Sequence, residues 1–456
     1  MRKICGVLRA HSTNPRYFTD DTGKPIYLTG SHTWSNIQEY LGPDPDKKFD
    51  YPSYLDWLEG YGFNFMRGWV WEEASYDNVA TEKIYIGPLP YVRSGPGIAA
   101  DGEAKFDLDT FNQDYFDRLR ERVVQAGERG IYVSVMLFNR WSTNERPDAG
   151  KLAWNGHPFN KDNNINNIDG DPEGLGGRMI HTLALPEVLK YQEHYVKKVI
   201  DTVGDLENVL YEIGNEHWED SGPWQCYMVR FIKDYEAGRL LQHPVGITSG
   251  GGAWRSLANQ KVLDSPADWI SLRPEEGMAY DTDPVAADGI KVNITDTDHI
   301  WGLGGNVDWV WKSMTRGLNP ILMDPYEPIY GMSDYTVESW KAVNCRDHPT
   351  WEPIRRNLAY AKTYAQRMEL EAAVPRTDLA TSGYCLAQYG QEYLVYIPEG
   401  REIAVNLGDE RGEFAVEWLN PDNGETVCGD KIQTANEKTF INPFSNAAVL
   451  YIARAV

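Results

Sequence analysis

The 456-residue chain is poor in positive charge. Lysine and arginine together number 44, against 67 aspartates and glutamates, so the formal net charge at pH 7 is −23. Nucleic acids and anionic membranes attract basic proteins, which makes so acidic a chain a poor partner for either. The composition therefore predicts no nucleic-acid partner and no membrane partner, and it disfavours a highly anionic polymer as ligand.

Long hydrophobic runs are also missing. No stretch approaches the ~20 consecutive apolar residues that a membrane-spanning helix requires. The first residues carry positive charge, but their apolar run extends only from Ile4 to Leu8, which is shorter than the ~7 to 15 residues of a signal-peptide core. We therefore expect a cytoplasmic protein, or a secreted or periplasmic one whose leader has been removed.

Cysteine is scarce and follows no pattern. The five cysteines are widely separated and show no C-x-x-C spacing, which argues against a zinc knuckle or a disulfide framework. Cys385 and Cys428 lie in one C-terminal region and could pair with each other. We expect all five to be reduced.

Aromatic residues, by contrast, are abundant, with 16 tryptophans and 27 tyrosines. One use for them is core filling, and another is a cleft whose walls stack on flat apolar faces such as sugar rings. The length exceeds what one ordinary hydrophobic core serves. We therefore expect two domains, or one large α/β barrel with an appendage.

Eight apolar, β-rich runs recur through the first 330 positions, with amphipathic helical stretches between several of them. This alternation is typical of a parallel sheet covered by helices, and eight such units predict a (β/α)8 TIM barrel. A doubly wound sheet would carry a glycine-rich phosphate turn after an early strand, and "LTGSHTW" is not one. The runs span residues 25–30, 63–71, 131–140, 208–216, 243–250, 267–272, 289–299 and 319–324.

Two long insertions follow the second and third of these runs. Residues 72–108 and 141–185 are rich in Gly, Asn, Asp, Pro and Trp and show little periodicity. Loops after the strands build the active face of a barrel, so we expect both insertions to be cleft walls. The Asn- and Asp-rich stretch 160–174 lacks the ligand spacing of a calcium loop and is predicted to be a solvated turn.

The pattern changes after a helical stretch at residues 349–370. From there, short alternating runs separated by Gly, Pro and Asn turns predict a small antiparallel β-sandwich. We therefore divide the chain into a (β/α)8 barrel domain, residues 1–372, and a β-sandwich accessory domain, residues 373–456.

Polar residues cluster where the predicted barrel strands end, the position at which barrels carry their chemistry. Cleavage of an acetal between sugars needs one carboxylic acid to protonate the leaving oxygen and one carboxylate to attack the anomeric carbon. The fourth and seventh strands end in acids, and an asparagine beside the fourth-strand acid suits a donor to a sugar hydroxyl. The strand-end residues are His32, Trp34, Arg67, Trp71, Asn139, Arg140, Asn215, Glu216, Ser249, Asp296, Asp298, His299 and Asp324.

Several motifs, in this order, resemble a known family. They are "RYFTDDTGKPIYLTGSHTW", "GFNFMRGWVW", "YEIGNE", "KVNITDTDHIWGLGG" and "WVWKSMTRGLNPILMDPYE". Together they are similar to the apiosidase-like family of (β/α)8 glycosidases, and "GNE" resembles the Asn-Glu acid/base signature of retaining barrel glycoside hydrolases. The tail, "YCLAQYGQEYLVYIPEG" and "FAVEWLNPDNGE", is similar to the "putative collagen-binding" β-sandwich that often follows that barrel.

The resemblance implies a retaining glycoside hydrolase that acts on a plant cell-wall or other glycan without a cofactor. Glu216 would be the acid/base. Relatives commonly end the seventh strand with Glu, whereas this chain offers two aspartates: the resemblance favours Asp298 as nucleophile, and strand counting favours Asp296. One of the two could instead cap the next helix or hold Arg67. The residues expected to contact substrate are Asn215, His32, Trp34, Arg67, Trp71, Asn139, Trp141, His299, Trp301 and Asp324.

Two other classes compete with this interpretation. The strand-end aspartates, His299 and His32 could ligate a divalent metal for hydrolysis of amides or phosphates. Metal-dependent barrel hydrolases usually open with His-x-His on the first strand, however, and "GSHTW" has one histidine. A catalytically inactive carbohydrate-binding protein is the third class. Sugar identity, linkage and oligomeric state are not encoded in a pattern.

Because two carboxylates suffice for this chemistry, we expect turnover of a glycoside to persist in EDTA. The measurement is hydrolysis of an active substrate before and after chelation. Activity lost in EDTA and restored by zinc or manganese would favour the metal-dependent hydrolase instead.

Overall fold

The computed structural model describes residues 3–41, 48–77, 83–143, 153–250, 257–324, 326–327, 346–347, 349–408, 412–434 and 436–455. Their packing defines two compact units. One contains Met1–Leu8, Ser31–Leu272 and Met323–His348, and the other contains Arg9–Gly30, Arg273–Leu322 and Pro349–Val456. The predicted domain boundary at residues 372 and 373 stays a prediction.

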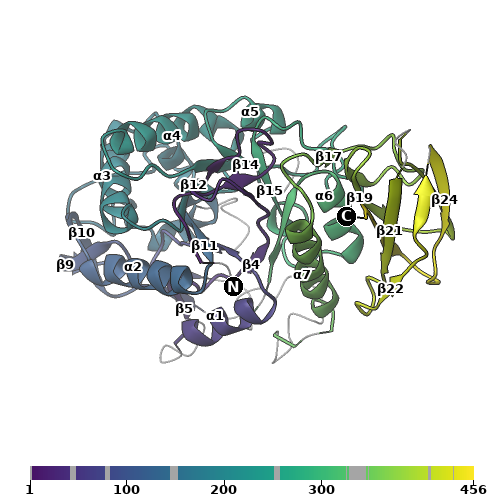
Figure 1. Ribbon diagram of the computed structural model, residues 1–456. Coiled ribbons are helices and arrows are strands. Elements are labelled where there is room, and N and C mark those ends of the chain that lie inside the picture. Colours follow the sequence, from purple (N-terminus) through teal and green to yellow (C-terminus); the bar gives the residue numbers. More distant parts are fainter. Residues whose placement is uncertain are drawn as a thin grey trace. The chain divides into compact units, whose positions relative to one another are not determined.

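Eight strands close into a barrel, which confirms the predicted fold class (Figure 1). Neighbouring strands are parallel, as in the pairing of Asn139 with Asn215 at the ends of β11 and β12. Because parallel strands end together, their terminal side chains gather at one rim. In spatial order the strands are β11 (Tyr132–Asn139), β12 (Val209–Asn215), β13 (Val245–Thr248), β14 (Trp269–Ser271), β15 (Val292–Asp296), β16 (Asn319–Met323), β4 (Gly30–His32) and β6 (Phe65–Gly68).

The first barrel strand differs from its prediction. Residues 25–30 were expected to form it, but the barrel strand is β4, which begins only at Gly30. Just before β4, hydrogen bonds that involve side chains take the place of main-chain strand pairing. Leu28 N donates to Asn319 Oδ1 at 3.1 Å, and Thr29 Oγ1 donates to the Pro320 carbonyl at 2.9 Å. A small antiparallel sheet takes up the preceding residues, with strands β1 (Arg9–Ala10), β2 (Phe18–Thr19) and β3 (Pro25–Ile26).

Helices occupy the amphipathic stretches between strands, and α2, α3 and α4 lie outside β11 and β12 (Figure 1). Side-chain caps begin three of them, because Asp50, Asn112 and Asn306 accept from backbone N–H groups of the first turn of α1, α2 and α6. Each long helix buries one apolar face. The helices are α1 (Tyr51–Gly60), α2 (Gln113–Glu128), α3 (Pro186–Val203), α4 (Gly222–Glu236), α5 (Asn259–Leu263), α6 (Val307–Thr315) and α7 (Glu352–Arg367).

The first insertion contains regular structure that its composition did not predict. Strands β7 (Ser75–Asp77) and β8 (Lys83–Gly87) form a sheet with β5 (Glu39–Leu41), and β9 (Tyr91–Ile98) pairs with β10 (Ala104–Phe111). Strand β9 was not predicted because its glycines and proline interrupt the alternation of apolar and polar residues; Gly95 and Gly97 adopt positive φ there. Both insertions contribute to one hydrophobic cluster, Ala74, Leu89, Tyr91, Phe106, Leu108, Trp154, Phe159, Ile180, Val188 and Tyr191.

The Asn-rich stretch 160–174 is only partly the solvated turn that was predicted. Asn163 and Asn164 are buried, with 1% and 3% exposed. The Asn163 amide donates to the carbonyls of Asn155 and His157, and its oxygen accepts from Ala100 N. These side chains replace a backbone ladder, because each satisfies several main-chain groups that the loop would otherwise bury unpaired.

The C-terminal strands form the predicted β-sandwich. A long sheet, in the order β17-β18-β19-β25-β21-β22 with β23 beside β21, packs with the β20–β24 pair around one apolar core that includes Tyr393, Val405, Trp418 and Phe440. Cys385 is buried, Cys428 is exposed, and both are free; Cys345 lies outside the described residues. The strands are β17 (Val374–Pro375), β18 (Cys385–Gln388), β19 (Glu392–Ile397), β20 (Glu402–Asn406), β21 (Gly412–Leu419), β22 (Thr426–Cys428), β23 (Ile432–Thr434), β24 (Glu437–Ile441) and β25 (Ala448–Arg454).

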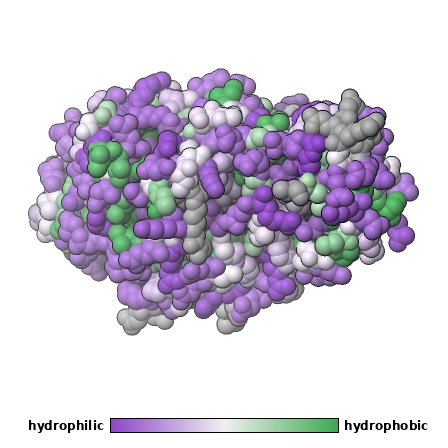
Figure 2. Space-filling view, viewed as in Figure 1, coloured by the Kyte–Doolittle hydropathy of each residue, from purple (hydrophilic) through white to green (hydrophobic). Residues whose placement is uncertain are grey.

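Most of the surface visible in Figure 2 is hydrophilic, with hydrophobic residues gathered in a few limited areas. Among the described residues, no helix combines the length and apolar character that crossing a bilayer demands.

We expect Gly246→Ala to lower the thermal midpoint by several degrees. A Cβ at Gly246 of β13 would lie 2.0 Å from the ring of Trp269 on β14, and overpacking of this kind typically costs about 1–3 kcal/mol. Gly60→Ala is the matched control, because nothing lies within 4 Å of its added Cβ. Equal midpoints for the two variants in calorimetry would contradict this account of the β13–β14 contact.

Candidate active site

The residue that directly follows strand β12 has an unusual backbone conformation. Every side chain of β12 is buried, and Glu216, the next residue, has φ of 52° and is 4% exposed. Left-handed backbone is uncommon for a residue other than glycine, and such strain often marks functional sites. Glu216 is therefore the leading candidate for chemistry at this rim.

Two donors converge on one oxygen of Glu216. Arg140 Nη2 and Trp141 Nε1 each lie 2.8 Å from Glu216 Oε2. Both belong to the 3-10 helix η1 (Arg140–Ser142), which directly follows β11. The Arg140 guanidinium also lies over the Trp218 ring, 4.6 Å from its centroid. Charge-assisted bonds of this kind stabilise a carboxylate and fix its orientation.

Asn215 is fixed from inside the barrel. Arg67 donates through Nε and Nη2 to Glu212, at 3.0 and 2.5 Å, and Nη2 also donates to Asn215 Oδ1 at 2.9 Å. The ion pair is almost fully buried, with 2% of the Arg67 side chain and none of the Glu212 side chain exposed. That a seventh-strand aspartate holds Arg67 stays a prediction.

Aromatic rings pack around the ends of β4 and β6. His32 stacks on Trp69 with centroids 5.4 Å apart, and Trp34 meets Trp71 edge to face at 5.6 Å. The Trp71 indole donates to the Trp34 carbonyl at 3.2 Å. These rings are buried in the described chain, with Trp34 at 9% exposed and Trp71 at 6%. His32, Trp34 and Trp71, all predicted contacts, are thus brought together.

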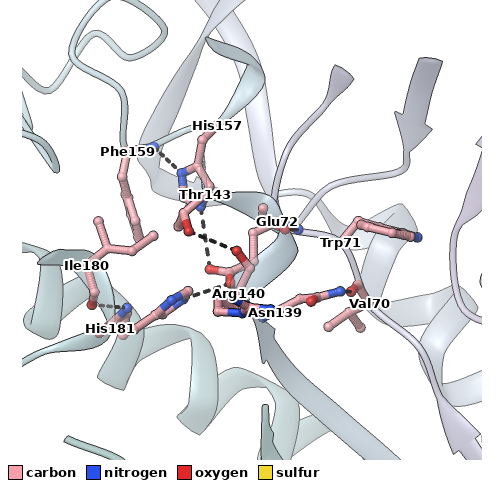
Figure 3. A network of polar contacts seen from close by, with 12 residues as sticks. Val70, Trp71, Glu72, Asn139, Arg140, Thr143, His157, Phe159, Ile180 and His181 are labelled. Atoms are coloured by element: carbon pink, nitrogen blue, oxygen red, sulfur yellow. Dashed lines mark hydrogen bonds and ion pairs between the residues drawn. The ribbon is translucent and has the colours of Figure 1, made fainter. Parts of the chain in front are cut away.

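A largely buried carboxylate, that of Glu72, organises the residues around η1 (Figure 3). Its Oε1 accepts from Asn139 N at 2.8 Å and from His181 Nε2 at 2.9 Å, and its own N–H donates to Ser142 Oγ at 2.9 Å. His157 Nε2 lies 3.5 Å from the other oxygen. Burial alone would raise the pKa of Glu72, but the adjacent His181 and His157 outweigh it, so the net pKa is lowered and the group is charged.

The histidines around Glu72 do not form a metal centre. Burial lowers the pKa of His157, and it lowers the pKa of His217 well below the usual range, so both are neutral at pH 7. His217 packs edge-on against His181, with centroids 4.4 Å apart. Within the described part of the chain, no cluster of three or more His, Cys, Asp or Glu side chains could hold a metal ion.

A cavity beside Glu72 is too small for a sugar. Its volume is about 30 Å³, enough for a water molecule or two but far below the ~300 Å³ of a small-molecule pocket. It is lined by Val70, Trp71, Glu72, Pro90, Tyr91, Tyr115, Leu137, Phe138, His157, Pro158, Phe159, Gln192 and Tyr195.

The Asn139 side chain serves the local backbone, and the main chain of Asp324 forms a turn; that either residue contacts substrate stays a prediction. The Asn139 amide donates to the Val70 carbonyl at 2.9 Å and its oxygen accepts from Trp141 N at 3.1 Å, so it caps η1. Asp324 is 1% exposed; its N–H donates to the His32 carbonyl, and its carbonyl accepts from Tyr326 N, as expected of a turn anchor.

The seventh-strand candidates belong to the other compact unit. Asp296 Oδ1 accepts from Asp298 N at 2.9 Å and so caps the 3-10 helix η5 (Thr297–His299). Asp298 is 7% exposed, and its Oδ2 lies 3.8 Å from His299 Nε2. Trp301 is 37% exposed and packs edge-on against Trp309. From the sequence, one of the two aspartates could cap the next helix, and Asp296 is the one that does so.

Four site residues escaped the sequence analysis: Glu72, His157, His181 and Glu212. The sequence could have revealed Glu212, because a carboxylate in the middle of an apolar strand needs a buried cationic partner. Asn36 and Gln38 also went unnoticed; their amides bond to the backbone of residues 67, 69 and 71 and so continue the strand pairing beyond β4. Nothing local marked the two histidines, which lie on an irregular insertion.

The fold and rim together define a (β/α)8 barrel protein with a C-terminal β-sandwich. Two sequence families match parts of the chain. Residues 85–252, which include Glu216, match the family described as "Domain of unknown function (DUF6298)". Residues 374–450 match the "Putative collagen-binding domain of a collagenase". Neither match covers half of the chain, and no curated protein matches it.

Solved structures share the fold over nearly the whole chain. A protein described as a glycoside hydrolase matches with a TM-score of 0.60 and 12% identity, covering 99% of this chain and 98% of that one. A glycoside hydrolase family 5 protein from Bacteroides vulgatus ATCC 8482 matches with a TM-score of 0.62 and 13% identity, covering 98% and 93%. At such identities the likeness establishes the architecture and leaves activity to be argued from the site.

Glu73, the neighbour of Glu72, is a carboxyl group whose burial should change its pKa. It is fully buried, and neither carboxyl oxygen makes a well-formed hydrogen bond within the described chain. Burial, only partly offset by the Ser142 hydroxyl, raises the pKa of Glu73 to about 8. In the unfolded chain the pKa is about 4.3, so between these values the folded state binds the extra proton and stability falls as pH rises.

We therefore expect Glu73→Gln to gain thermal stability relative to the native chain as pH rises from 5 to 8. The glutamine mimics the protonated acid and removes its pH dependence. Thermal midpoints of both proteins across this range provide the measurement, with exposed Glu59→Gln as control. A difference that stays constant with pH would show that Glu73 is not protonated in the folded state.

Proposed function

We propose that this protein is a retaining glycoside hydrolase, with Glu216 as the acid/base. The observation that carries the proposal is the placement of Glu216: it follows a barrel strand, in left-handed backbone, with two donors on one oxygen. Barrel enzymes place their catalytic residues at this end of the strands. The similarity of the fold to proteins described as glycoside hydrolases supports the assignment.

In the first step, the Glu216 carboxylic acid would protonate the glycosidic oxygen while an aspartate attacks the anomeric carbon. The carbon–oxygen bond breaks, the aglycone leaves as an alcohol, and the sugar is held as an ester of the aspartate. In the second step, the Glu216 carboxylate takes a proton from water, which attacks the same carbon and frees the aspartate. Arg140 and Trp141 would stabilise the carboxylate that exists between the steps.

For the nucleophile we propose Asp298 ahead of Asp296. Asp296 already accepts from the Asp298 N–H in capping η5, whereas the Asp298 carboxylate extends past the strand beside His299. Retention requires the attacking carboxylate to lie about 5 to 5.5 Å from that of Glu216. We expect this separation for the true nucleophile.

We propose a neutral sugar as the substrate at the cleavage point. Arginines occur near Glu216, but each has a carboxylate partner: Arg140 pairs with Glu216, Arg67 with Glu212, and Arg178 with Asp220. Positive charge is therefore balanced, which gives no special affinity for an acidic sugar. Asn215 is proposed to bond the 2-hydroxyl, and His32, Trp34, Trp71 and Trp301 to line the subsites of a plant cell-wall or other glycan.

A panel of aryl glycosides and plant polysaccharides would identify a substrate, and variants would then test the roles. Glu216→Ala should lose on the order of 10²–10⁴-fold in kcat on substrates with poor leaving groups, which need protonation. It should retain more activity on an activated aryl glycoside. Azide should partly rescue it by attacking the glycosyl-enzyme.

Loss of the true nucleophile should instead abolish activity on both kinds of substrate. Whichever of Asp298→Ala and Asp296→Ala keeps measurable activity on the activated glycoside is not the nucleophile. Inverted product stereochemistry by NMR would refute retention while leaving hydrolysis intact. Full activity in Glu216→Ala on poor leaving groups would refute the acid/base assignment.

A further inference from the structure

We propose that Glu72 is a positioning residue that acts on Glu216 through η1. This inference rests on the proposed function of Glu216, because it names the part of the chain that holds the acid/base in place. In the described part of the chain, Glu72 itself makes no hydrogen bond to Glu216. Its influence would pass through Arg140 and Trp141, the two donors that bind Glu216 Oε2.

Glu72 fastens η1 at both ends. At the start, its Oε1 accepts from the N–H of Asn139, the N-cap residue, at 2.8 Å. At the finish, its own N–H donates to the Ser142 hydroxyl at 2.9 Å. The two donors to Glu216 lie between these points, and a one-turn helix so short has little internal bonding to hold its own shape. Two external attachments therefore determine where Arg140 and Trp141 point.

The second insertion in turn fixes Glu72 (Figure 3). His181, at the end of the 3-10 helix η3 (Arg178–His181), donates to its Oε1 at 2.9 Å. The Gln192 amide of α3 donates to the Ile180 carbonyl and so anchors η3. His157 approaches the other oxygen at 3.5 Å, and Asn163 bonds the His157 carbonyl. The second insertion, which was expected to be a cleft wall, therefore holds Glu72 in place and, through Glu72, would help to position the proposed acid/base.

Only an acceptor fits the place of the Glu72 side chain. The carboxylate is mostly buried, with 11% of the side chain exposed, and both groups closest to Oε1 are donors. The group nearest the other oxygen, His157 Nε2, is a donor too, because His157 Nδ1 accepts from Phe159 N. A glutamine must therefore turn its NH2 group either toward His157 or toward Asn139 N and His181. Glu72→Gln thus preserves volume while it places NH2 against a donor in either orientation and weakens the attachment of η1.

We expect Glu72→Gln to lower kcat by on the order of 10²-fold, the typical effect of misplacing a catalytic group by about 1 Å. KM should change little, because no substrate contact is removed. The basic limb of the pH–activity profile should move to higher pH, since the Glu216 carboxylate loses donors that stabilise its charged form. Glu72→Asp, which keeps the charge, should recover part of kcat.

Glu121→Gln is the matched control, because Glu121 is exposed on α2, where it accepts a hydrogen bond from Gln125 one turn further along the helix. It should leave kcat, KM and the pH profile unchanged. If Glu72→Gln fails to fold, Ser142→Ala removes the other attachment and should lower kcat in the same direction by a smaller factor. A Glu72→Gln protein that folds with native kcat and pH profile would overturn the proposal.

A spectroscopic readout separates this inference from the proposed function. The indole N–H of Trp141, identified as the signal missing from Trp141→Phe, should be shifted downfield in the native chain by its bond to a carboxylate. It should move upfield in Glu72→Gln and stay in place in Glu121→Gln. If no glycoside is hydrolysed but this signal moves, the proposed function fails and the positioning stands. If hydrolysis is found but the signal does not move, the positioning is wrong.

Discussion

The buried ion pair between Arg67 and Glu212 is the constraint around which the rim is built. It joins strands β6 and β12 across β11, with almost none of either side chain exposed. Removing two charges from water costs several kcal/mol per ion, which only good geometry and further hydrogen bonds can offset. Both arise here, because the pairing is bidentate and Arg67 also bonds Asn215. The ion pair thereby fixes the residue that precedes Glu216.

Glu216 is thus held from two independent directions. From inside the barrel, Arg67 fixes Asn215, while from the rim, η1 supplies Arg140 and Trp141 to the carboxylate. Each direction ends in another acid that has its own donors: Arg67 for Glu212, and Asn139 N and His181 for Glu72. Because a carboxylate removed from water is costly unless it is hydrogen-bonded, these donors determine whether the two acids can hold the residues beside Glu216 in place.

The sequence predicted the regular elements well and the supporting contacts poorly. Alternation located seven of the eight barrel strands and the sandwich, since burial on both faces of a parallel strand leaves a continuous apolar run. It failed before β4, where side chains of Asn319 and Thr29 replace ladder bonds. Glu216 was identified as a candidate because barrel enzymes place their catalytic residues at the ends of strands. Glu72 and His181 were missed because their pairing joins residues 109 positions apart, which no local pattern encodes.

The residues "GNEH" that close strand β12 can now be explained together. A Cβ at Gly214 would lie 2.2 Å from His217 Nε2 and 2.5 Å from the Phe138 carbonyl, so only glycine lets the histidine fold back against the strand. That reversal requires a tight turn at the intervening position, and the positive φ of Glu216 provides it. The strain of order 1 kcal/mol or more is offset by packing of His217 against His181 and Trp224. The same turn directs the Glu216 carboxylate to η1, so one local conformation serves both the burial of His217 and the role proposed for Glu216.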